Sequence, residues 1–377
     1  MKVRYLKNSF ILGAVFCLLI FIGCGEQKRS ENKQVEIYTQ LKVLDINVWS
    51  GLDYKGYLWV GRYETDTEYK ARYHSLIENI TTLDPDIITV HEANKLPNYI
   101  CNLANDLDMD AIHHLGVGGV RFGPVGLPWN LREGDAILAK KDLNLEFVDR
   151  VQISGGYVGN FASFHFEDAN QVIAGRVILN DQILYIFTTH WHASVPDIPE
   201  YISLTEKVSA EYGFTETELN EALKTIHDET RWRVREADGT INFVQKIAGN
   251  LPYLLTGDFN STPEMEELKK VTILGLIDTY RVVNPSSSGY TWHPGKNSNI
   301  LKYYNTNNVS KGENLYDLTY NYFEKDSVRI DYIFLHPIDD FLTVYSSDVS
   351  LNKKIGNIHP SDHFGVFTIF NVSDYKE

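Results

Sequence analysis

Cysteine and positive charge are both scarce in this sequence. It has only three cysteines among 377 residues. Cys17 and Cys24 lie in the N-terminal segment discussed below, so Cys101 is the only other thiol, and a large core is expected to be stable without a disulfide framework. Lys and Arg number 35 against 50 Asp and Glu, a formal net charge of −15. No basic stripe offsets this balance, which argues against nucleic acid as a partner.

An uncharged apolar run from Phe10 to Ile22 follows three basic residues at the N-terminus. It is shorter than the roughly 20 residues that span a bilayer as a helix, and it suits a secretory signal. The sequence FIGC at 21–24 resembles the lipobox of bacterial lipoproteins, in which the cysteine is acylated and becomes the mature N-terminus. We therefore expect an exported protein held by a lipid on Cys24 at the bacterial envelope, on the outer membrane or cell surface. An uncleaved N-terminal anchor is the alternative.

The chain divides into three predicted segments. Residues 1–23 form the lipoprotein signal peptide, residues 24–37 a polar linker, and residues 38–377 one catalytic domain. A hydrophobic content of 43% is enough for a large core in that domain. The domain is expected to be a monomer.

Strand patterns outnumber helical ones, and their order is mixed. Residues 40–49 alternate as a strand does, whereas the apolar residues of 67–80 share one helical face. Further predicted strands lie at 87–90, 135–140, 160–166, 171–179, 182–193, 250–260, 329–337 and 363–370. This pattern predicts an α/β fold, a four-layer sandwich of two packed mixed β-sheets flanked by helices, rather than a doubly wound parallel sheet.

Helices and loops are predicted between these strands. Residues 194–249 are polar and largely helical in pattern, with Thr215 and Glu218 spaced as a capping box. A second helix is predicted at 264–275. Residues 284–328 are rich in Ser, Asn, Gly and Tyr, and are expected to form long surface loops.

Polar side chains recur where predicted strands end. A rigid strand end is a suitable mount for groups that point into a cleft. Asp331 differs, because it falls inside the apolar run RIDYIFL, and a buried carboxylate is costly unless it is paired or binds a metal. The strand-end residues are Asn47, Glu92, His190, Asp258, Asn260, Asp362 and His363.

Seven motifs in a fixed order resemble the endonuclease/exonuclease/phosphatase family of metal-dependent phosphoesterases. They are LDINVWSG, IITVHEA, GDAILAK, FTTHWHA, LTGDFNSTP, RIDYIFL and PSDHFGV. Together they cover nearly the whole predicted domain. The resemblance implies the four-layer sandwich of the family, with a cleft at one end of the two sheets.

The resemblance also implies that the protein binds a divalent cation, either Mg²⁺ or, in place of Mg²⁺, Mn²⁺. A phosphodiester is anionic and repels an attacking water, and Mg²⁺ neutralises charge that develops on its oxygens while preferring carboxylate and amide ligands. Glu92 matches the main metal ligand of the family, with Asn47 beside it and Asp362 near the metal. A bound cation would also let an acidic protein accept an anionic substrate.

The remaining matched residues are expected to be catalytic. Asp258 matches the carboxylate that orients and deprotonates water, and Asn260 the amide that steadies the phosphate. Asp331 matches the residue that holds His363, which then stabilises the transition state or takes a proton. His190 matches a histidine that contacts the phosphate or protonates the leaving group. Its carboxylate partner cannot be identified from the sequence.

Three histidines within these motifs allow other interpretations. His190 and His192 lie two residues apart and would share a strand face, which is compatible with a zinc pair, although no further Cys or His lies nearby at ligand spacing. His91 is expected to be a structural histidine.

The substrate remains open between three classes of phosphoester. NVWSG and THWHA resemble segments of neutral sphingomyelinases, which favours a phosphodiesterase acting on lipid headgroups or other small diesters. A secreted endonuclease and a sugar or inositol phosphate phosphomonoesterase are the alternatives. A surface lipoprotein that binds a ligand through an inactive cleft is a fourth interpretation, but every matched position keeps its expected residue type.

Overall fold

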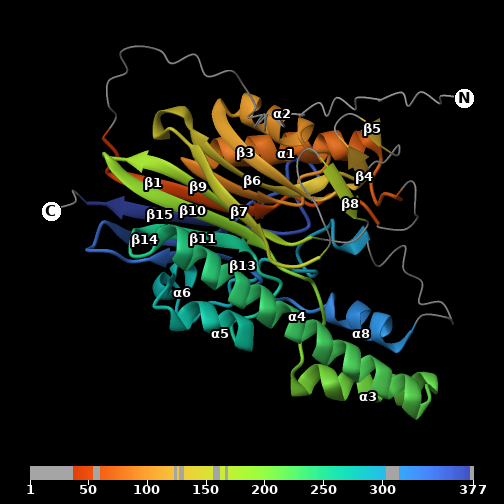
Figure 1. Ribbon diagram of the computed structural model, residues 1–377. Helices are drawn as coiled ribbons and strands as arrows, with labels where there is room; N and C mark the ends of the chain where they lie inside the picture. The colour runs from red at the N-terminus through yellow and green to blue at the C-terminus, as the bar shows by residue number, and fades with distance from the viewer. Residues whose placement is uncertain are drawn as a thin grey trace, which may run out of the picture.

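Two six-stranded sheets pack face to face, with helices on both outer faces (Figure 1). The computed structural model describes residues 37–53, 60–122, 125–126, 131–155, 162–165, 169–302 and 314–373. The predicted signal peptide and lipobox lie outside these residues, as does the predicted linker apart from Ile37. The α/β four-layer sandwich predicted from the sequence is confirmed. In the part of the chain that is described, no helix has both the length and the apolar character needed to cross a bilayer.

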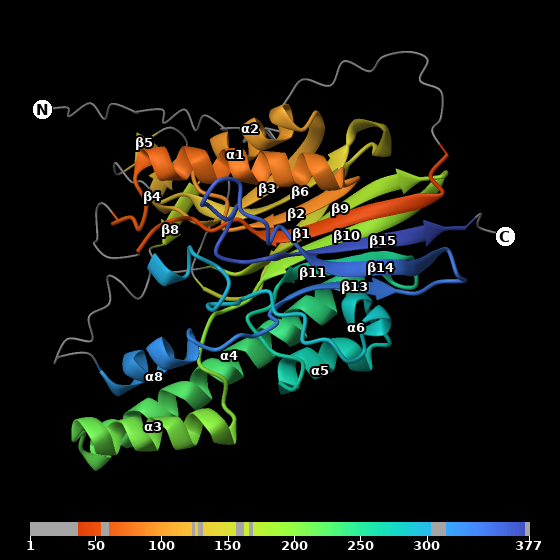
Figure 2. The ribbon, with the colours of Figure 1, turned by 180° about the vertical axis from the view of Figure 1, so that it is seen from behind.

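The first sheet carries helices α1 (Asp66–Leu83) and α2 (Asn98–Asp106) on its outer face (Figure 2). A capping box formed by Thr65 and Glu68 starts α1. Strands β1 and β2 are parallel, and β15 pairs with β1 in the antiparallel direction. In spatial order the strands are β14 (Leu342–Ser350), β15 (Gly365–Val372), β1 (Gln40–Asn47), β2 (Ile87–His91), β6 (Glu133–Lys140) and β3 (Met109–Val117).

The second sheet is covered by α4 (Glu216–Ala248) and α5 (Glu266–Ile273), and α4 begins at the predicted capping box. Its spatial order is β12 (Ile277–Asp278), β13 (Asp331–His336), β11 (Tyr253–Asp258), β10 (Gln182–His190), β9 (Gln171–Leu179) and β7 (Glu146–Gln152). Beside the sandwich lie α3 (Pro199–Tyr212), α6 (Thr279–Val283), α8 (Leu315–Phe323), the short helix η1 (Lys141–Leu143), and a small sheet of β5 (Val125–Gly126), β4 (Gly119–Phe122) and β8 (Ala162–His165).

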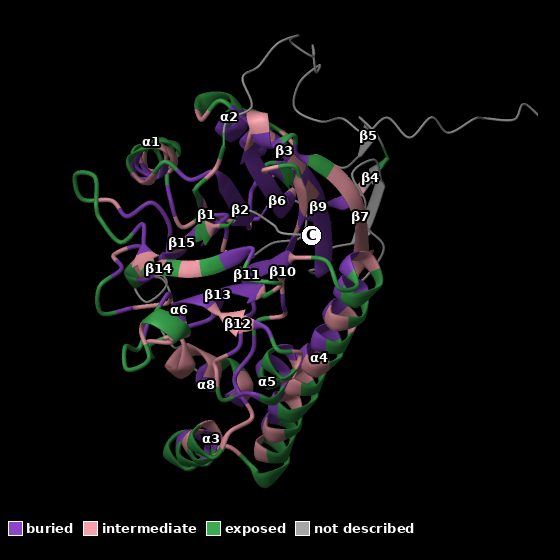
Figure 3. Cartoon of the chain, turned by 90° about the vertical axis from the view of Figure 1, so that its left-hand side faces the viewer, coloured by how far each residue is buried: buried purple, intermediate pink, exposed green. Residues whose placement is uncertain are grey.

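The core lies mainly between the two sheets. The facing strands β1, β2, β10 and β11 are mostly buried (Figure 3). Val43 and Ile87 of the first sheet are fully buried in one cluster with Ile186 and Leu254 of the second. Complete burial of each such side chain stabilises the fold by about 1.5–3 kcal/mol relative to exposure. This packing holds the two sheets in a fixed relative position.

One edge of the sandwich collects the polar strand ends. Strands β1, β2, β10 and β11 all finish there, because each sheet contributes one parallel pair. Antiparallel β13 and β15 begin at the same edge, where Asp331 lies opposite Asp258. The topology therefore brings together residues that lie more than 300 positions apart in the sequence, such as Asn47 and His363.

Several expectations need correction. Residues 284–328 are not simply loops, because they contain α8, and Trp292 forms β-bridges with Val328 and His363. Asp331 is the first residue of β13, so that it lies at a strand end like the other polar residues. The sequence predicted a core without a disulfide framework, but Cys101 is disulfide-bonded.

A buried histidine with two carboxylates lies between the sheets, directly below the polar edge. His91 is fully buried, with its Nε2 3.0 Å from Asp45 Oδ1 and its Nδ1 3.2 Å from Asp135 Oδ1. Burial alone would lower the pKa of His91, but the charges of Asp45 and Asp135 and their hydrogen bonds raise it well above its ordinary value. The structural role expected for His91 agrees with these contacts.

We predict that His91 is an imidazolium at pH 7.5. Because the pKa of His91 is raised in the folded state, its contacts with Asp45 and Asp135 stabilise the fold fully below about pH 6.5. This stabilisation is lost as the pH rises through the folded pKa of His91. NMR of protein with labelled histidine is expected to show a doubly protonated ring whose signals are absent from His91→Gln. Signals of a neutral tautomer of His91 at pH 7.5 would contradict an imidazolium between Asp45 and Asp135.

Gly257 places Asp258, and the backbone leaves no room for a side chain at this position. A Cβ at Gly257 would lie 2.1 Å from the main-chain oxygen of Thr189 on neighbouring β10. We predict that Gly257→Ala lowers the free energy of unfolding by about 1–3 kcal/mol, the usual cost of overpacking. Gly295→Ala is the control, because the nearest neighbour of its Cβ is 3.5 Å away. Urea denaturation measures both, and equal stabilities of the two variants would refute the steric argument.

Candidate active site

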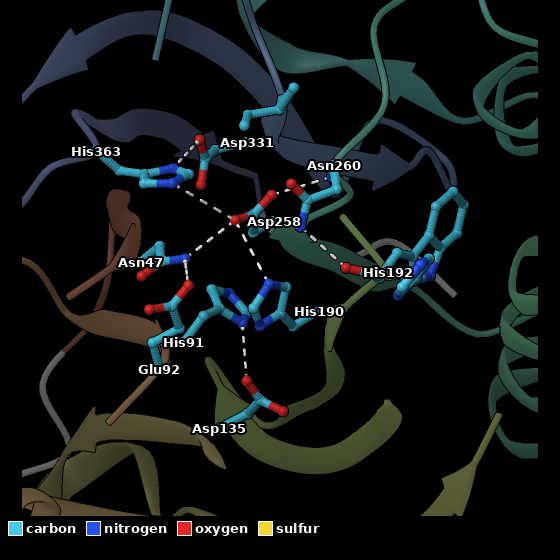
Figure 4. A network of polar contacts seen from close by, with 12 residues as sticks. Asn47, His91, Glu92, Asp135, His190, His192, Asp258, Asn260, Asp331 and His363 are labelled. Atoms are coloured by element: carbon cyan, nitrogen blue, oxygen red, sulfur yellow. Dashed lines mark hydrogen bonds and ion pairs between the residues drawn. The ribbon is translucent and has the colours of Figure 1, made fainter. Parts of the chain in front are cut away.

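Asp258, the last residue of β11, is the centre of the polar edge (Figure 4). Its side chain is almost completely buried. Oδ1 accepts a hydrogen bond of 3.0 Å from the main-chain nitrogen of Asn260, and Oδ2 accepts one of 3.0 Å from Asn47 Nδ2. The Nε2 atoms of His190 and His363 lie 3.7 and 3.8 Å from the same Oδ2. Four of the predicted site residues therefore surround this one carboxylate.

His363 is held by Asp331, as the sequence predicted. Its Nδ1 lies 2.9 Å from Asp331 Oδ2, and the Asp331 side chain is fully buried. Burial alone would lower the pKa of His363, but the charges of Asp331 and Asp258 raise it well above its ordinary value. The carboxylate at Nδ1 fixes the ring so that Nε2 faces Asp258. His363 is therefore oriented to exchange a proton or to donate a hydrogen bond at Nε2.

His190 has the carboxylate partner that the sequence did not reveal. It is the last residue of β10 and lies opposite Asp258 in the parallel pairing of β10 with β11. Burial would lower its pKa, whereas the charges of Asp258, Glu92 and Asp135 raise it. The Asp258 carboxylate thus lies close to two histidines, His190 at the end of β10 and His363 in the segment before β15.

Asn47 joins the two sheets at the predicted metal residue Glu92. Its Nδ2 donates to Glu92 Oε1 at 2.8 Å as well as to Asp258, and its Oδ1 accepts from the main-chain nitrogen of Trp49 at 2.9 Å. Glu92 Oε2 accepts from the Ser50 nitrogen at 3.2 Å. Glu92 and Trp49 both have positive φ, 56° and 58°. A backbone conformation that is unfavourable for these residues thus orients the carboxylate at the site.

Asp362 and Asn260 complete the predicted set. The Ser361 hydroxyl lies 3.1 Å from Asp362 Oδ1 and donates to the main-chain oxygen of Asn47 at 2.6 Å. Asn260 Nδ2 donates to the Trp191 oxygen at 2.9 Å. Both contacts hold side chains of the loops that leave the strands at the edge.

These residues line a cavity of about 730 Å³ at the polar edge. Six of the eight predicted residues contribute to its wall, while Asn47 and Asp331 lie behind it. Sequence analysis missed several other wall residues, among them Tyr63, Trp292, Tyr320 and Glu324. Burial and the charge of Asp362 raise the pKa of Glu324 to about 7. Of these, only Tyr320 and Trp292 gave any signal in the sequence, as aromatic residues in a polar segment.

A hard divalent cation fits the donors of this cavity. Glu92, Asp258 and Asp362 all present carboxylates to it, and its wall contains no Lys or Arg among the described residues. Carboxylate oxygens are the ligands that Mg²⁺ prefers. Ligand atoms of Asp258, Asp331 and His363 lie within 4.8 Å of one another, but the contacts between His363 and the two carboxylates already explain that grouping.

The alternative zinc pair is not supported by the geometry. His192 does not join His190 at the cavity. Its ring stacks on Trp232 at a centroid distance of 4.4 Å, and its Nε2 contacts Glu229. Its main-chain nitrogen donates to Glu236 Oε2 at 2.8 Å. The two histidines therefore have separate surroundings.

Comparison with known proteins agrees with this architecture. D. rerio TDP2 complexed with a single-strand DNA product is 14% identical with a TM-score of 0.54, covering 89% of this chain and all of that one. An endonuclease/exonuclease/phosphatase from Bacteroides vulgatus is 16% identical with a TM-score of 0.54, with the same coverage. The human Nocturnin catalytic domain with bound sulfate is 16% identical with a TM-score of 0.52, covering 89% and 95%. At these identities the likeness concerns the fold alone.

No curated protein matches the chain significantly by sequence. Residues 46–363, however, match the endonuclease/exonuclease/phosphatase family, and this range includes seven of the predicted site residues together with His363 at its end. The match covers most of the chain and agrees with the fold and with the order of the seven motifs. The chain therefore belongs to the endonuclease/exonuclease/phosphatase family and is a phosphoester hydrolase.

Proposed function

We propose that this protein hydrolyses small phosphodiesters, lipid headgroup esters in particular, with the help of Mg²⁺. The observation that carries the proposal is the cavity itself, in which two histidines and three predicted site carboxylates meet on a wall without a described Lys or Arg. Such a site needs a metal ion in order to accept an anion, and it offers no basic groove to a polyanion.

The metal would be held by Glu92 and Asp362, with Asn47 beside them. When bound, it would neutralise charge on the phosphate oxygens. Asp258 then orients the attacking water and accepts its proton. Of the other groups, His363 stabilises the developing charge, because Asp331 fixes its ring and favours its protonated form. His190 donates a hydrogen bond to the phosphate or a proton to the leaving oxygen, and Asn260 steadies the phosphate.

Charge favours a small diester over nucleic acid. Duplex DNA carries one negative charge per about 1.7 Å of axis, and proteins that bind it supply Lys and Arg to its phosphates. The chain has a net charge of −15, and the described cavity wall has no such residue. The motifs NVWSG and THWHA, which resemble those of neutral sphingomyelinases, support a headgroup substrate. A lipid on Cys24 would hold the exported enzyme at the envelope, close to such substrates.

We predict that a chelator abolishes hydrolysis of bis-p-nitrophenyl phosphate and that Mg²⁺ restores it, because the carboxylates of the site cannot bind an anion without a cation. Release of p-nitrophenol measures the rate. Turnover that is unchanged by chelator would count against the metal mechanism. Sphingomyelin, plasmid DNA and p-nitrophenyl phosphate, assayed in parallel, separate the headgroup, nuclease and phosphomonoesterase alternatives.

We further predict that His363→Ala and Asp258→Ala each lower kcat at least about a hundredfold, as expected for the loss of acid-base catalysis. His227→Ala is the control, since this exposed histidine of α4 pairs with Asp197 and does not line the cavity. The assay uses bis-p-nitrophenyl phosphate with saturating Mg²⁺. Near-normal turnover by either variant would remove that residue from its assigned role.

A further inference from the structure

Glu236 is a buried carboxylate of α4 that does not line the catalytic cavity. Its side chain is fully buried, and it accepts three hydrogen bonds, all from neutral groups. Oε2 accepts from the main-chain nitrogen of His192 at 2.8 Å, and Oε1 accepts from Asn170 Nδ2 at 2.7 Å and from the Ser154 hydroxyl. Burying a carboxylate is costly, and an apolar side chain could fill the same space. The presence of Glu236 therefore indicates a role beyond stability.

The peptide group between Trp191 and His192 links Glu236 to the catalytic site. Its N–H donates to Glu236, and its carbonyl oxygen accepts the hydrogen bond of 2.9 Å from Asn260 Nδ2 (Figure 4). The N–H and the carbonyl of a trans peptide group point in opposite directions within one rigid plane. Glu236 and Asn260 therefore bond the same rigid unit from its two sides.

The bond to this peptide group determines the orientation of the Asn260 amide. A carbonyl oxygen only accepts hydrogen bonds, so the amide must face Trp191 with its Nδ2 and not with its Oδ1. A carboxylate that accepts from the N–H of a peptide group polarises it and strengthens its oxygen as an acceptor. The orientation of the Asn260 amide thus depends on the Trp191 oxygen, and the position of that oxygen depends on Glu236.

Two neighbours of Glu236 on α4 hold the same segment of chain, which follows β10. Arg233 lies three residues before Glu236 and Thr240 four residues after it, so that all three share one face of the helix. Trp191 Nε1 donates to Thr240 Oγ1 at 3.1 Å, and Arg233 Nη1 donates to the hydroxyl of Ser194. This face of α4 therefore fixes the segment as a whole, and Glu236 supplies the bond to its 191–192 peptide group.

We propose that Glu236 is a positioning residue for the hydrolysis, which holds the Asn260 amide through the 191–192 peptide group in the orientation that contacts the phosphate. Glu236 acts from behind the cavity wall and touches no reacting atom. This inference rests on the proposed phosphodiesterase function. It adds a residue of α4 that none of the seven sequence motifs contains.

Glu236→Gln tests the proposal because an amide has a single acceptor oxygen. Glutamine cannot accept from Ser154 and Asn170 on one side and from His192 on the other. We expect kcat for bis-p-nitrophenyl phosphate to fall at least about tenfold, on the scale of a misplaced catalytic group. The Mg²⁺ concentration that gives half of the maximal rate is expected to change less than about twofold, because Glu236 bonds none of the predicted metal ligands. An unchanged kcat would overturn the proposal.

Glu229→Gln is the matched control. Glu229 lies two turns earlier on α4 and contacts the same residue, His192, but at Nε2 of the ring and not at the main chain. It does not line the cavity. We expect its kcat to stay within about twofold of that of the unaltered protein. An equal fall in both variants would mean that α4 supports the segment only in a general way, which would refute the specific role of Glu236.

A double-mutant cycle separates positioning from a structural role. If Glu236 acts through Asn260, little remains for Glu236→Gln to remove once Asn260→Ala is in place. We expect Glu236→Gln to lower the kcat of Asn260→Ala less than about threefold, against at least about tenfold in the unaltered protein. The same factor in both backgrounds would refute action through Asn260. Urea denaturation checks that each variant is folded. Should Glu236→Gln not fold, Glu236→Asp replaces it with the same expected result, because its side chain is one methylene shorter.

An NMR measurement decides the proposal even if the protein hydrolyses no diester, an outcome that would count against the proposed function alone. In the full chain with isotope-labelled asparagine, the side-chain amide signals of Asn260 are those that are absent from Asn260→Ala. We expect these signals to shift in Glu236→Gln and to stay in place in Glu229→Gln, because only the first change alters the peptide group that the amide bonds. Asn260 signals that are identical in Glu236→Gln and in the unaltered protein would refute the link independently of any activity.

Discussion

The structure depends on how a buried carboxylate, Asp258, is paired at the junction of two sheets. An isolated buried carboxylate is costly, and this one is compensated by an amide from the first sheet and by imidazoles that approach from both sheets. The same contacts fix the relative position of β1, β10 and β11 at their ends. One set of interactions therefore stabilises both the fold and the site. Gly257 is required because β11 must pass within contact distance of β10 in order to place Asp258 at the junction of the two sheets.

Much of this arrangement could be predicted from local sequence. Apolar runs that finish in polar residues identified β1, β2, β10 and β11, and the order of the motifs implied that their ends converge. The partner of His190 could not be found in this way, because it depends on the register of two parallel strands that are separated by α3 and α4. The Asp45–His91–Asp135 group was missed for a similar reason: three strands contribute one residue each, and no short motif contains them.

The wall opposite the strand ends was the least predictable part. Residues 284–328 have the composition of a loop, yet α8 forms there because Asn314 caps its N-terminus and because Leu315 and Leu318 pack with Val208 of α3 and Ala222 of α4. Tertiary packing of a short helix outweighs its weak local signal. Strands β3, β7 and β14 were likewise not recognised, since edge and twisted strands show a less regular alternation than central ones.

The strand ends on one side, and the loops and α8 on the other, have different roles in the cavity. Strand ends hold the reacting groups rigidly, and substitutions there would disturb the core. The loops and α8 lie outside the core, so the side chains that they present to the cavity can differ between members of the family. Family membership therefore indicates the reaction, and the wall must indicate the substrate. In this chain the wall adds acidic and aromatic residues to a site that is already acidic. A bound divalent cation would compensate the charge needed to bind a phosphate. The side chains of the wall would then decide which group the phosphate carries, because selection between substrates depends on contacts that differ between them.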